Sequence, residues 1–151
     1  MATQGFEFAY SMDATKPWLE SVATTASVTY RKGDLLILSS GAVALGTAGF
    51  VEPVVGIAAE AATVTSSTVP TTIKVARATP AHVFRVQYTG TPNAAAVRGG
   101  TIDISNSGTV NAADISPGTV STEPGVILDK ELDTDNTFAY VRLRNIYGYG
   151  N

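Results

Sequence analysis

Short runs of apolar and β-branched residues, each ended by a turn signal, recur along the whole chain. Such runs are typical of β-strands, and glycines such as Gly33 in RKGD and Gly41 in SSG mark the turns between them. The strands predicted from these runs are 26–30, 35–38, 42–45, 54–58, 73–78, 82–88, 101–105, 126–128 and 137–147. Turn signals at a spacing of about 8–12 residues indicate an all-β sandwich or barrel. No helical pattern alternates with the strands, which disfavours an α/β fold.

Alternation within two of these runs predicts which side chains face outward. In IKVARA, Ile73 and Val75 occupy the apolar side and Lys74 and Arg77 the polar side, with one slip in the alternation. In HVFRVQY, Arg85 is expected to face outward. The segment AAEAATV, which lacks a cap and is short, is expected to be extended or a single turn. Segments rich in Gly, Pro, Asn, Ser or Thr are expected to be loops, namely 63–72, 89–100 and 106–125.

The first 21 residues have a pattern of their own, and we expect an extended N-terminal arm over 1–21 and a single β domain over 22–151. Phe6, Phe8 and Tyr10 alternate with polar or small residues, which predicts a strand with one apolar face. Pro17 prevents a helix from following it. Two interpretations of this strand are open. It belongs to the sheet of its own domain, or it pairs with the sheet edge of another chain, as in β-strand addition.

Aromatic residues are concentrated at the two ends of the chain. Phe6, Phe8, Tyr10 and Trp18 lie in the first twenty residues, and Tyr147 and Tyr149 lie in the last five. Chain ends fray unless they are docked, and aromatic side chains are enriched in the cores of interfaces. The sequence therefore predicts that both ends are held down, either on the body of this chain or on a neighbour. We expect the four N-terminal aromatic residues, Phe6, Phe8, Tyr10 and Trp18, to bind a partner. The two C-terminal tyrosines are a candidate subunit interface.

Composition narrows the classes of partner. The chain has 151 residues, a formal net charge of −3, no cysteine and a single histidine. Arg142 and Arg144 alternate with apolar residues and form no basic stripe, so we expect no nucleic-acid partner. No apolar run approaches the ~18 residues of a membrane-spanning helix, and the first residues lack the pattern of a secretory signal. We therefore expect no membrane partner.

A search for catalytic and ligand-binding motifs points away from an enzyme. The sequence has no G-x-S-x-G elbow and no phosphate-binding loop, and the single His82 is expected to lie on the surface or at a strand end. The segment 129–135 carries four carboxylates at alternate positions. We interpret it as a solvated acidic turn, with a calcium site as the alternative, because it lacks the central glycine of an EF-hand loop. The expectation is a protein with no catalytic residue, no cofactor and no metal.

The block YRKGDLLILSSGAVALGTAGFVEPVVGIAAEAA, at 30–62, resembles the capsid decoration or cement proteins of tailed bacteriophages. The similarity consists of the KGDLLIL strand, a glycine turn, a second short strand, a spacer and VVGIAAEAA, and the TFAYVRLRN strand near the end is similar in style. The likeness covers 26–62 well and the rest of the chain loosely.

This resemblance implies a small β-barrel or β-tulip-like sandwich with an extended N-terminal arm. It also implies a structural protein of the virion, made in the host cytoplasm and seated on the outer surface of the expanded capsid. Its partners would be the major capsid protein, to which the arm over Phe6–Tyr10 would add a strand, and copies of itself, as a homotrimer. The alternative is another virion or cell-surface β module, such as a fibre, tail or glycan-binding domain.

Overall fold

The structure is a computed structural model that describes residues 5–47, 50–65, 71–88, 98–105, 114–120, 126–129 and 138–148. Every regular element among these residues is a β-strand, so the prediction of an all-β fold is confirmed. The strands are β1 (Glu7–Ser11), β2 (Trp18–Ala23), β3 (Val28–Tyr30), β4 (Leu35–Ser39), β5 (Ala42–Leu45), β6 (Val54–Ala58), β7 (Ala62–Val64), β8 (Thr72–Arg77), β9 (His82–Gln87), β10 (Ile102–Ser105), β11 (Asp114–Val120), β12 (Val126–Leu128) and β13 (Phe138–Leu143).

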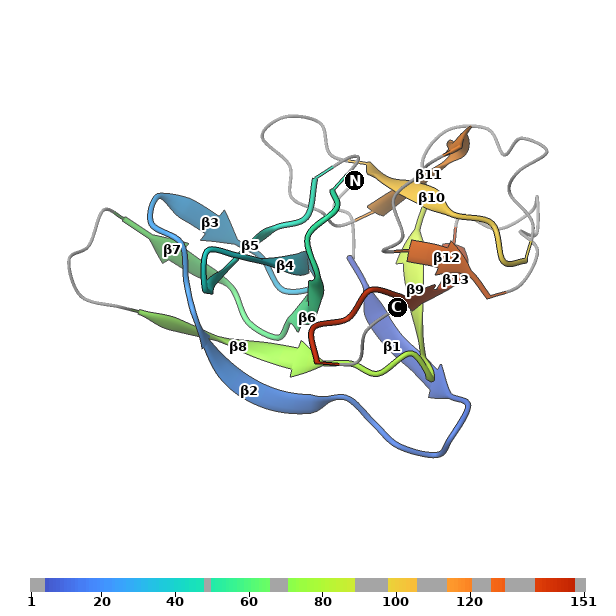
Figure 1. Ribbon diagram of the computed structural model, residues 1–151, viewed down its shortest axis with the longest axis horizontal. Coiled ribbons are helices and arrows are strands. Elements are labelled where there is room, and N and C mark those ends of the chain that lie inside the picture. Colours follow the sequence, from blue (N-terminus) through green and yellow to red (C-terminus); the bar gives the residue numbers. More distant parts are fainter. Residues whose placement is uncertain are drawn as a thin grey trace.

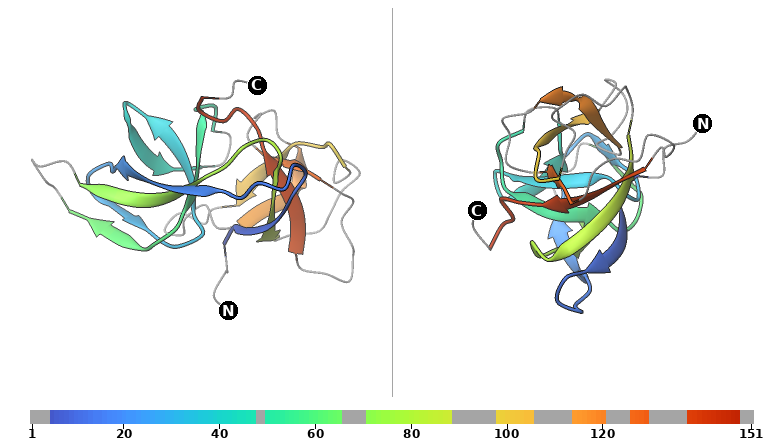
Figure 2. Two further views of the ribbon diagram at one scale, coloured as in Figure 1. Left: turned by 90° about the horizontal axis from the view of Figure 1, so that it is seen from below. Right: turned by 90° about the vertical axis from the view of Figure 1, so that its right-hand side faces the viewer.

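The strands form two main antiparallel sheets, which lie side by side along the long axis of the molecule (Figure 1). One sheet has the order β2-β8-β6-β4-β5, and the other has the order β1-β9-β13-β12. Two smaller pairs, β3-β7 and β10-β11, lie toward opposite ends of the long axis (Figures 1 and 2). Ile102 and Ile104 of β10 belong to the same core as side chains of both main sheets. A sandwich-like arrangement fits this architecture, and none of the sheets closes into a barrel among the described strands.

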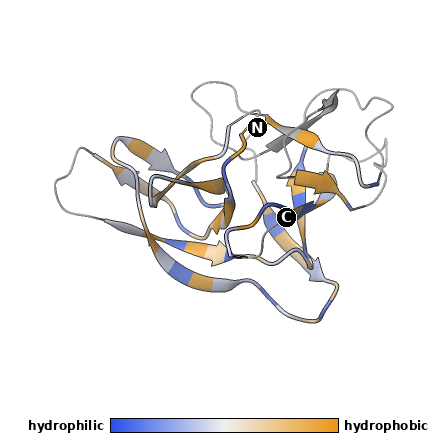
Figure 3. Ribbon diagram, viewed as in Figure 1, coloured by the Kyte–Doolittle hydropathy of each residue, from blue (hydrophilic) through white to orange (hydrophobic). Residues whose placement is uncertain are grey.

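Strand β4 shows why the apolar run at 35–38 has no polar position. Leu35 and Ile37 point into a large core between the two main sheets, whereas Leu36 points into a second core beneath the β3-β7 pair. Because side chains alternate across a strand, a strand with a core on both faces must be apolar throughout. Each fully buried Leu or Ile stabilises the fold by about 1.5–3 kcal/mol. In Figure 3, β4, β6 and β12 are accordingly coloured as mainly hydrophobic.

The RKGD turn before β4 supports the start of the chain. Gly33 has a φ of 97°, and its carbonyl oxygen accepts a hydrogen bond of 2.9 Å from the backbone N–H of Phe6. Gly5 also has a positive φ, and a Cβ added to it would lie 2.9 Å from the Cα of Gly33. The two glycines therefore allow the backbone before β1 to cross directly over this turn.

Strand β1 belongs to the sheet of its own chain, which is the first of the two interpretations of the N-terminal segment. It pairs antiparallel with β9, with Phe8 opposite Phe84 and Glu7 opposite Arg85, and the register shifts between Phe8 and Tyr10. The ion pair between Arg85 and Glu7, at 2.8 Å, links the same two strands.

Two strands lie where the sequence predicted no regular body strand. β2 runs through the expected boundary between arm and domain and pairs with β8 over its whole length, from Trp18 opposite Arg77 to Ala23 opposite Thr72. β11 lies inside a segment expected to be a loop, because its Pro117 and Gly118 are poor strand formers. It is an edge strand that pairs only with β10 among the described strands, and edges are where proline is tolerated.

Candidate interaction surfaces

Arg77 brings the two aromatic ends of the chain together. Its guanidinium lies 5.6 Å from the centre of the Trp18 ring and 5.7 Å from that of the Tyr147 ring. Trp18 begins β2, directly opposite Arg77 in the register, whereas Tyr147 follows β13 and is held by a backbone hydrogen bond of 2.8 Å to Val54. We call Trp18, Arg77 and Tyr147 the aromatic surface.

The expectation that Arg77 faces outward with Lys74 is wrong. Arg77 is 9% exposed, because it shares the side of β8 that carries Ile73 and Val75. Its Nε donates to the carbonyl of Val55 at 3.1 Å, and one Nη donates to the carbonyl of Tyr147 at 3.0 Å. The alternation continues through Arg77 without the slip that the sequence suggested.

An ion pair completes the set of contacts around Arg77. Its second Nη binds the carboxylate of Glu20, which is half exposed, on the adjacent strand β2. Each guanidinium nitrogen thus has an acceptor, so the burial of this charge is compensated. Trp18 and Tyr147 remain 42% and 51% exposed over this fixed cation.

The other predicted arm residues lie in three different environments. Phe6 is 3% exposed and belongs to the large core, so its side chain is not available to a partner. Phe8 is partly buried and contacts the rings of His82 and Phe84 edge-on, at 5.6 and 6.1 Å. Tyr10 is 38% exposed. Tyr149 lies outside the described residues.

Tyr10 is held at the end of the four-stranded sheet. Its hydroxyl donates a hydrogen bond of 2.7 Å to Asp129, and its ring lies 6.2 Å from that of Tyr140. Partial burial and the hydrogen bond to the Asp129 carboxylate raise the pKa of Tyr10 to about 12. Asp129 also forms an ion pair of 3.2 Å with Arg142. The rest of the predicted acidic turn, 130–135, lies outside the described residues.

His82 lies at a strand end, as the first residue of β9, but it is buried and not on the surface, because the turn after β1 folds over it. Its Nδ1 accepts a hydrogen bond of 3.0 Å from the backbone N–H of Thr79, so the proton lies on Nε2. Nε2 then donates to the Thr15 hydroxyl at 2.8 Å, and this hydroxyl donates to Asp13 at 2.6 Å. Burial lowers the pKa of His82, whereas hydrogen bonds from Ser11 and Thr15 lower the pKa of Asp13 to about 2.

The order of this chain of hydrogen bonds is structural and not that of a nucleophile. In a catalytic triad the imidazole accepts the proton of the hydroxyl, and the carboxylate accepts from the imidazole. Here His82 donates to Thr15, and Asp13 accepts from Thr15, so the imidazole does not accept the hydroxyl proton as it does in a triad. This series of hydrogen bonds fixes the turn between β1 and β2 onto the start of β9. Within the described ranges, no three His, Cys, Asp or Glu side chains are grouped so that they could hold a metal ion.

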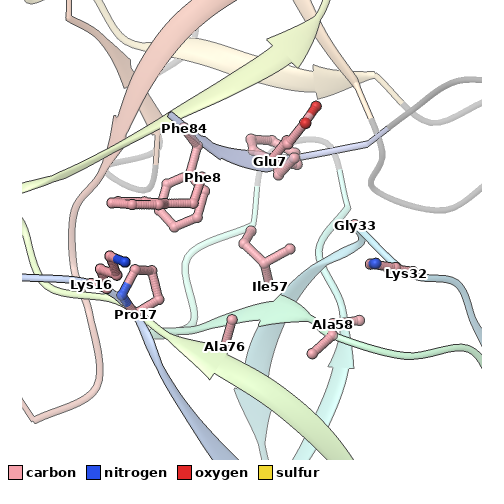
Figure 4. A pocket seen from close by; sticks show the side chains of 12 residues that line it. Glu7, Phe8, Lys16, Pro17, Lys32, Gly33, Ile57, Ala58, Ala76 and Phe84 are labelled. Atoms are coloured by element: carbon pink, nitrogen blue, oxygen red, sulfur yellow. The ribbon is translucent and has the colours of Figure 1, made fainter. Parts of the chain in front are cut away.

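An apolar groove of about 420 Å³ opens between the two main sheets, below β1 (Figure 4). Phe8 and Phe84 line it from one sheet, and Ile57 and Ala76 line it from the other. Lys16 lies at one end of the groove in Figure 4 and Lys32 at the other. No local pattern in the sequence marks either lysine as part of a site. They lie in turns 16 residues apart, and only the crossing of β1 over the RKGD turn places both beside one groove.

Comparison with known proteins provides no family assignment for this chain. No protein-family model matches the sequence, and neither the curated proteins nor the solved structures include a match. Among the described residues, no helix is long and apolar enough to cross a membrane.

Proposed function

We propose that this chain is a structural, non-catalytic protein that binds the outside of an expanded phage capsid and stabilises the shell against the pressure of the packaged DNA. The sequence resemblance over 26–62 suggests this class of protein. The single observation that supports a binding role most directly is the aromatic surface. There, Trp18 and Tyr147 are exposed although they come from opposite ends of the chain.

The aromatic surface has the properties of a binding anchor. Exposed Trp and Tyr side chains are enriched among the residues that dominate binding energies, and Arg is enriched with them. Arg77 contacts both rings and is itself fixed by two backbone carbonyls and Glu20. Rings that are already ordered lose little conformational entropy on binding, so more of the contact energy remains as affinity.

Binding alone is enough to stabilise a shell. A protein that binds only the expanded lattice stabilises it by RT ln(1 + [L]/Kd) per site, about 2.7 kcal/mol at a hundredfold excess over Kd. A homotrimer would engage several capsid subunits at once and would gain avidity from its linked sites. A β body whose central sheet is packed on both faces provides a stiff support for such contacts.

The test is binding to shells of the major capsid protein of the phage that, on this proposal, encodes the chain, measured by co-sedimentation. The expected result is saturable binding to expanded shells and at least tenfold weaker binding of the variant W18A/Y147A. Met12→Ala is the matched control, because Met12 is another exposed apolar residue but lies outside the aromatic surface. Failure of the wild-type protein to bind expanded shells, or equal binding of W18A/Y147A, would reject the proposal.

A glycan-binding module is the second candidate, and the same two exposed rings favour it. The apolar faces of sugar rings pack on aromatic side chains, and a guanidinium between them can donate hydrogen bonds to hydroxyl groups. A glycan array distinguishes the two functions. Binding to a defined oligosaccharide that is lost in W18A/Y147A, together with no binding to shells, would favour the glycan-binding class.

A further inference from the structure

The groove below β1 is built from fixed side chains and backbone. Phe84 and Ile57 are buried members of the large core, and Phe8 packs against it. Phe8 lies directly opposite Phe84 in the register, so both side chains are on the face of their sheet that looks into the groove (Figure 4). The opening is therefore a place where the interior between the two sheets reaches the surface. Its apolar walls suit an aliphatic or aromatic side chain.

The rim of the groove is positively charged, although the chain as a whole carries a net charge of −3. Lys16 and Lys32 stand at its two ends, and neither has an ion-pair partner among the residues that the structure describes. Glu7 also lines the groove, but its carboxylate is paired with Arg85. An occupant with an acidic group on each side of an apolar one would complement this arrangement.

The backbone beside the groove favours a peptide over a lipid or a nucleotide. β1 is the last strand of its sheet, and among the described strands none pairs with its outer edge. A free strand edge offers N–H and C=O groups that only another extended backbone can pair with regularly. Successive residues of a strand direct their N–H and C=O groups to opposite edges, so one of Glu7 and Phe8, the two residues of strand β1 that line the groove, has both groups on the outer edge.

We propose that this groove binds an extended acidic segment of a partner protein, with one apolar side chain inserted between Phe8, Phe84 and Ile57 and with flanking carboxylates at Lys16 and Lys32. The segment would add to the outer edge of β1. Trp18 and Tyr147 do not line the groove, so this site differs from the aromatic surface and goes beyond the proposed capsid role.

The experiment uses the full-length protein and an array of synthetic octapeptides that vary in charge and in the central residue. The expected result is selection of peptides with Leu, Ile, Phe or Trp between Asp or Glu residues. Fluorescence anisotropy on the best of these peptides then measures Kd. Because both rim charges are exposed, raising the NaCl concentration from about 50 to about 500 mM should weaken binding severalfold.

Two variants test the groove itself. K16E/K32E should raise the Kd for the acidic peptide by about tenfold or more, because the double substitution turns two exposed attractions into repulsions. K74E/R144E is the matched control, since it makes the same change of net charge at exposed cations that do not line the groove, and its Kd should stay within twofold. Ala59→Phe, at the groove wall, should block binding without any change of charge. Thermal unfolding of each variant verifies that it folds.

Selection of basic or neutral peptides, or equal effects of the two charge reversals in folded proteins, would overturn the proposal. A change of molar mass on light scattering in K16E/K32E alone would also overturn it, because the occupant would then be a second copy of this chain. Binding to capsid shells is measured separately with W18A/Y147A, so either proposal can fail while the other stands.

Discussion

Arg77 donates a hydrogen bond of 3.0 Å to the carbonyl oxygen of Tyr147, a residue 70 positions later in the chain. The same guanidinium lies against the ring of Trp18 on the neighbouring strand. One buried cation therefore fixes the position of aromatic residues from both ends of the sequence. This contact explains how an exposed tyrosine close to the C-terminus can remain ordered.

Removal of Arg77 should be costly for stability. Arg77→Ala leaves the carbonyl of Val55 and the carboxylate of Glu20 without this donor, and we expect a loss of about 2–4 kcal/mol in the free energy of unfolding. Urea denaturation measures the loss. Arg144→Ala, at an exposed arginine, should change the same quantity by less than about 0.5 kcal/mol. Similar losses in the two variants would contradict the structural role of Arg77.

The buried His82 should make the fold sensitive to mild acid. Its pKa in the folded protein lies below the ordinary value of 6.5, so the unfolded chain binds more protons below about pH 6.5. Stability should therefore be constant from pH 8 to 7 and fall as the pH drops from about 6.5 toward 5. The free energy of unfolding at each pH measures this slope. His82 is the single histidine of the sequence, so His82→Gln should remove most of the slope, and a slope that persists in this variant would contradict the explanation.

Asp13 should affect the stability of the fold in a separate, more acidic pH range. Hydrogen bonds from Ser11 and Thr15 lower its pKa from 3.8 to about 2, so its contribution to stability is present above pH 3.8 and is lost as the pH falls toward 2. Asp13→Asn should flatten the stability profile in this range and leave the slope between pH 6.5 and 5 in place. Titration of the Asp13 carboxyl by NMR gives its pKa directly, and a value near 3.8 would contradict the hydrogen-bonded geometry.

Gly56 should be intolerant of any side chain. A Cβ at this position would lie 2.2 Å from the backbone carbonyl oxygen of Ala76, so Gly56→Ala forces β6 away from β8. We expect a loss of about 3 kcal/mol or more in the free energy of unfolding. Gly41→Ala is the comparison. Gly41 has a φ of 81° but open space around it, so that loss should be about 1 kcal/mol. Equal losses would show that the two strands can separate without cost.

Tyr10 should ionise only in strongly alkaline solution. Its pKa of about 12 follows from partial burial and from the hydrogen bond to Asp129. The difference in ultraviolet absorbance between the wild-type protein and Tyr10→Phe should titrate with a midpoint near pH 12. A midpoint near 10 would mean that the hydroxyl does not bind Asp129.

Local sequence patterns were sufficient to predict a strand where one or both of its faces are buried. The runs at 42–45 and 54–58 are strands with the predicted bounds, because their apolar side chains face cores on the two sides of the central sheet. The sequence did not reveal β2 as a strand of the sheet. Its WLESVA pattern is that of an exposed edge, where polar and apolar residues are both tolerated and periodicity is weak.

The candidate sites were less predictable than the fold. Strict alternation places Arg77 on the side of Ile73 and Val75, and the slip was assumed only because a buried arginine is rare. No local pattern shows that the carbonyls of Val55 and Tyr147 accept its hydrogen bonds. The same limit applies to His82, which is buried because Thr15 and Thr79 satisfy both of its ring nitrogens. In each case the deciding partners are distant in sequence or belong to the backbone, and neither leaves a local pattern.

The position of β9 between the first and last strands has a consequence for how the chain acquires its structure. β9 pairs with β1 on one side and with β13 on the other, so the central ladder of this sheet joins segments more than a hundred residues apart. During synthesis, β1 cannot form its ladder until β9 has left the ribosome, and this sheet stays incomplete until β13 follows. Folding dominated by such distant pairings is slow, on the order of milliseconds to seconds.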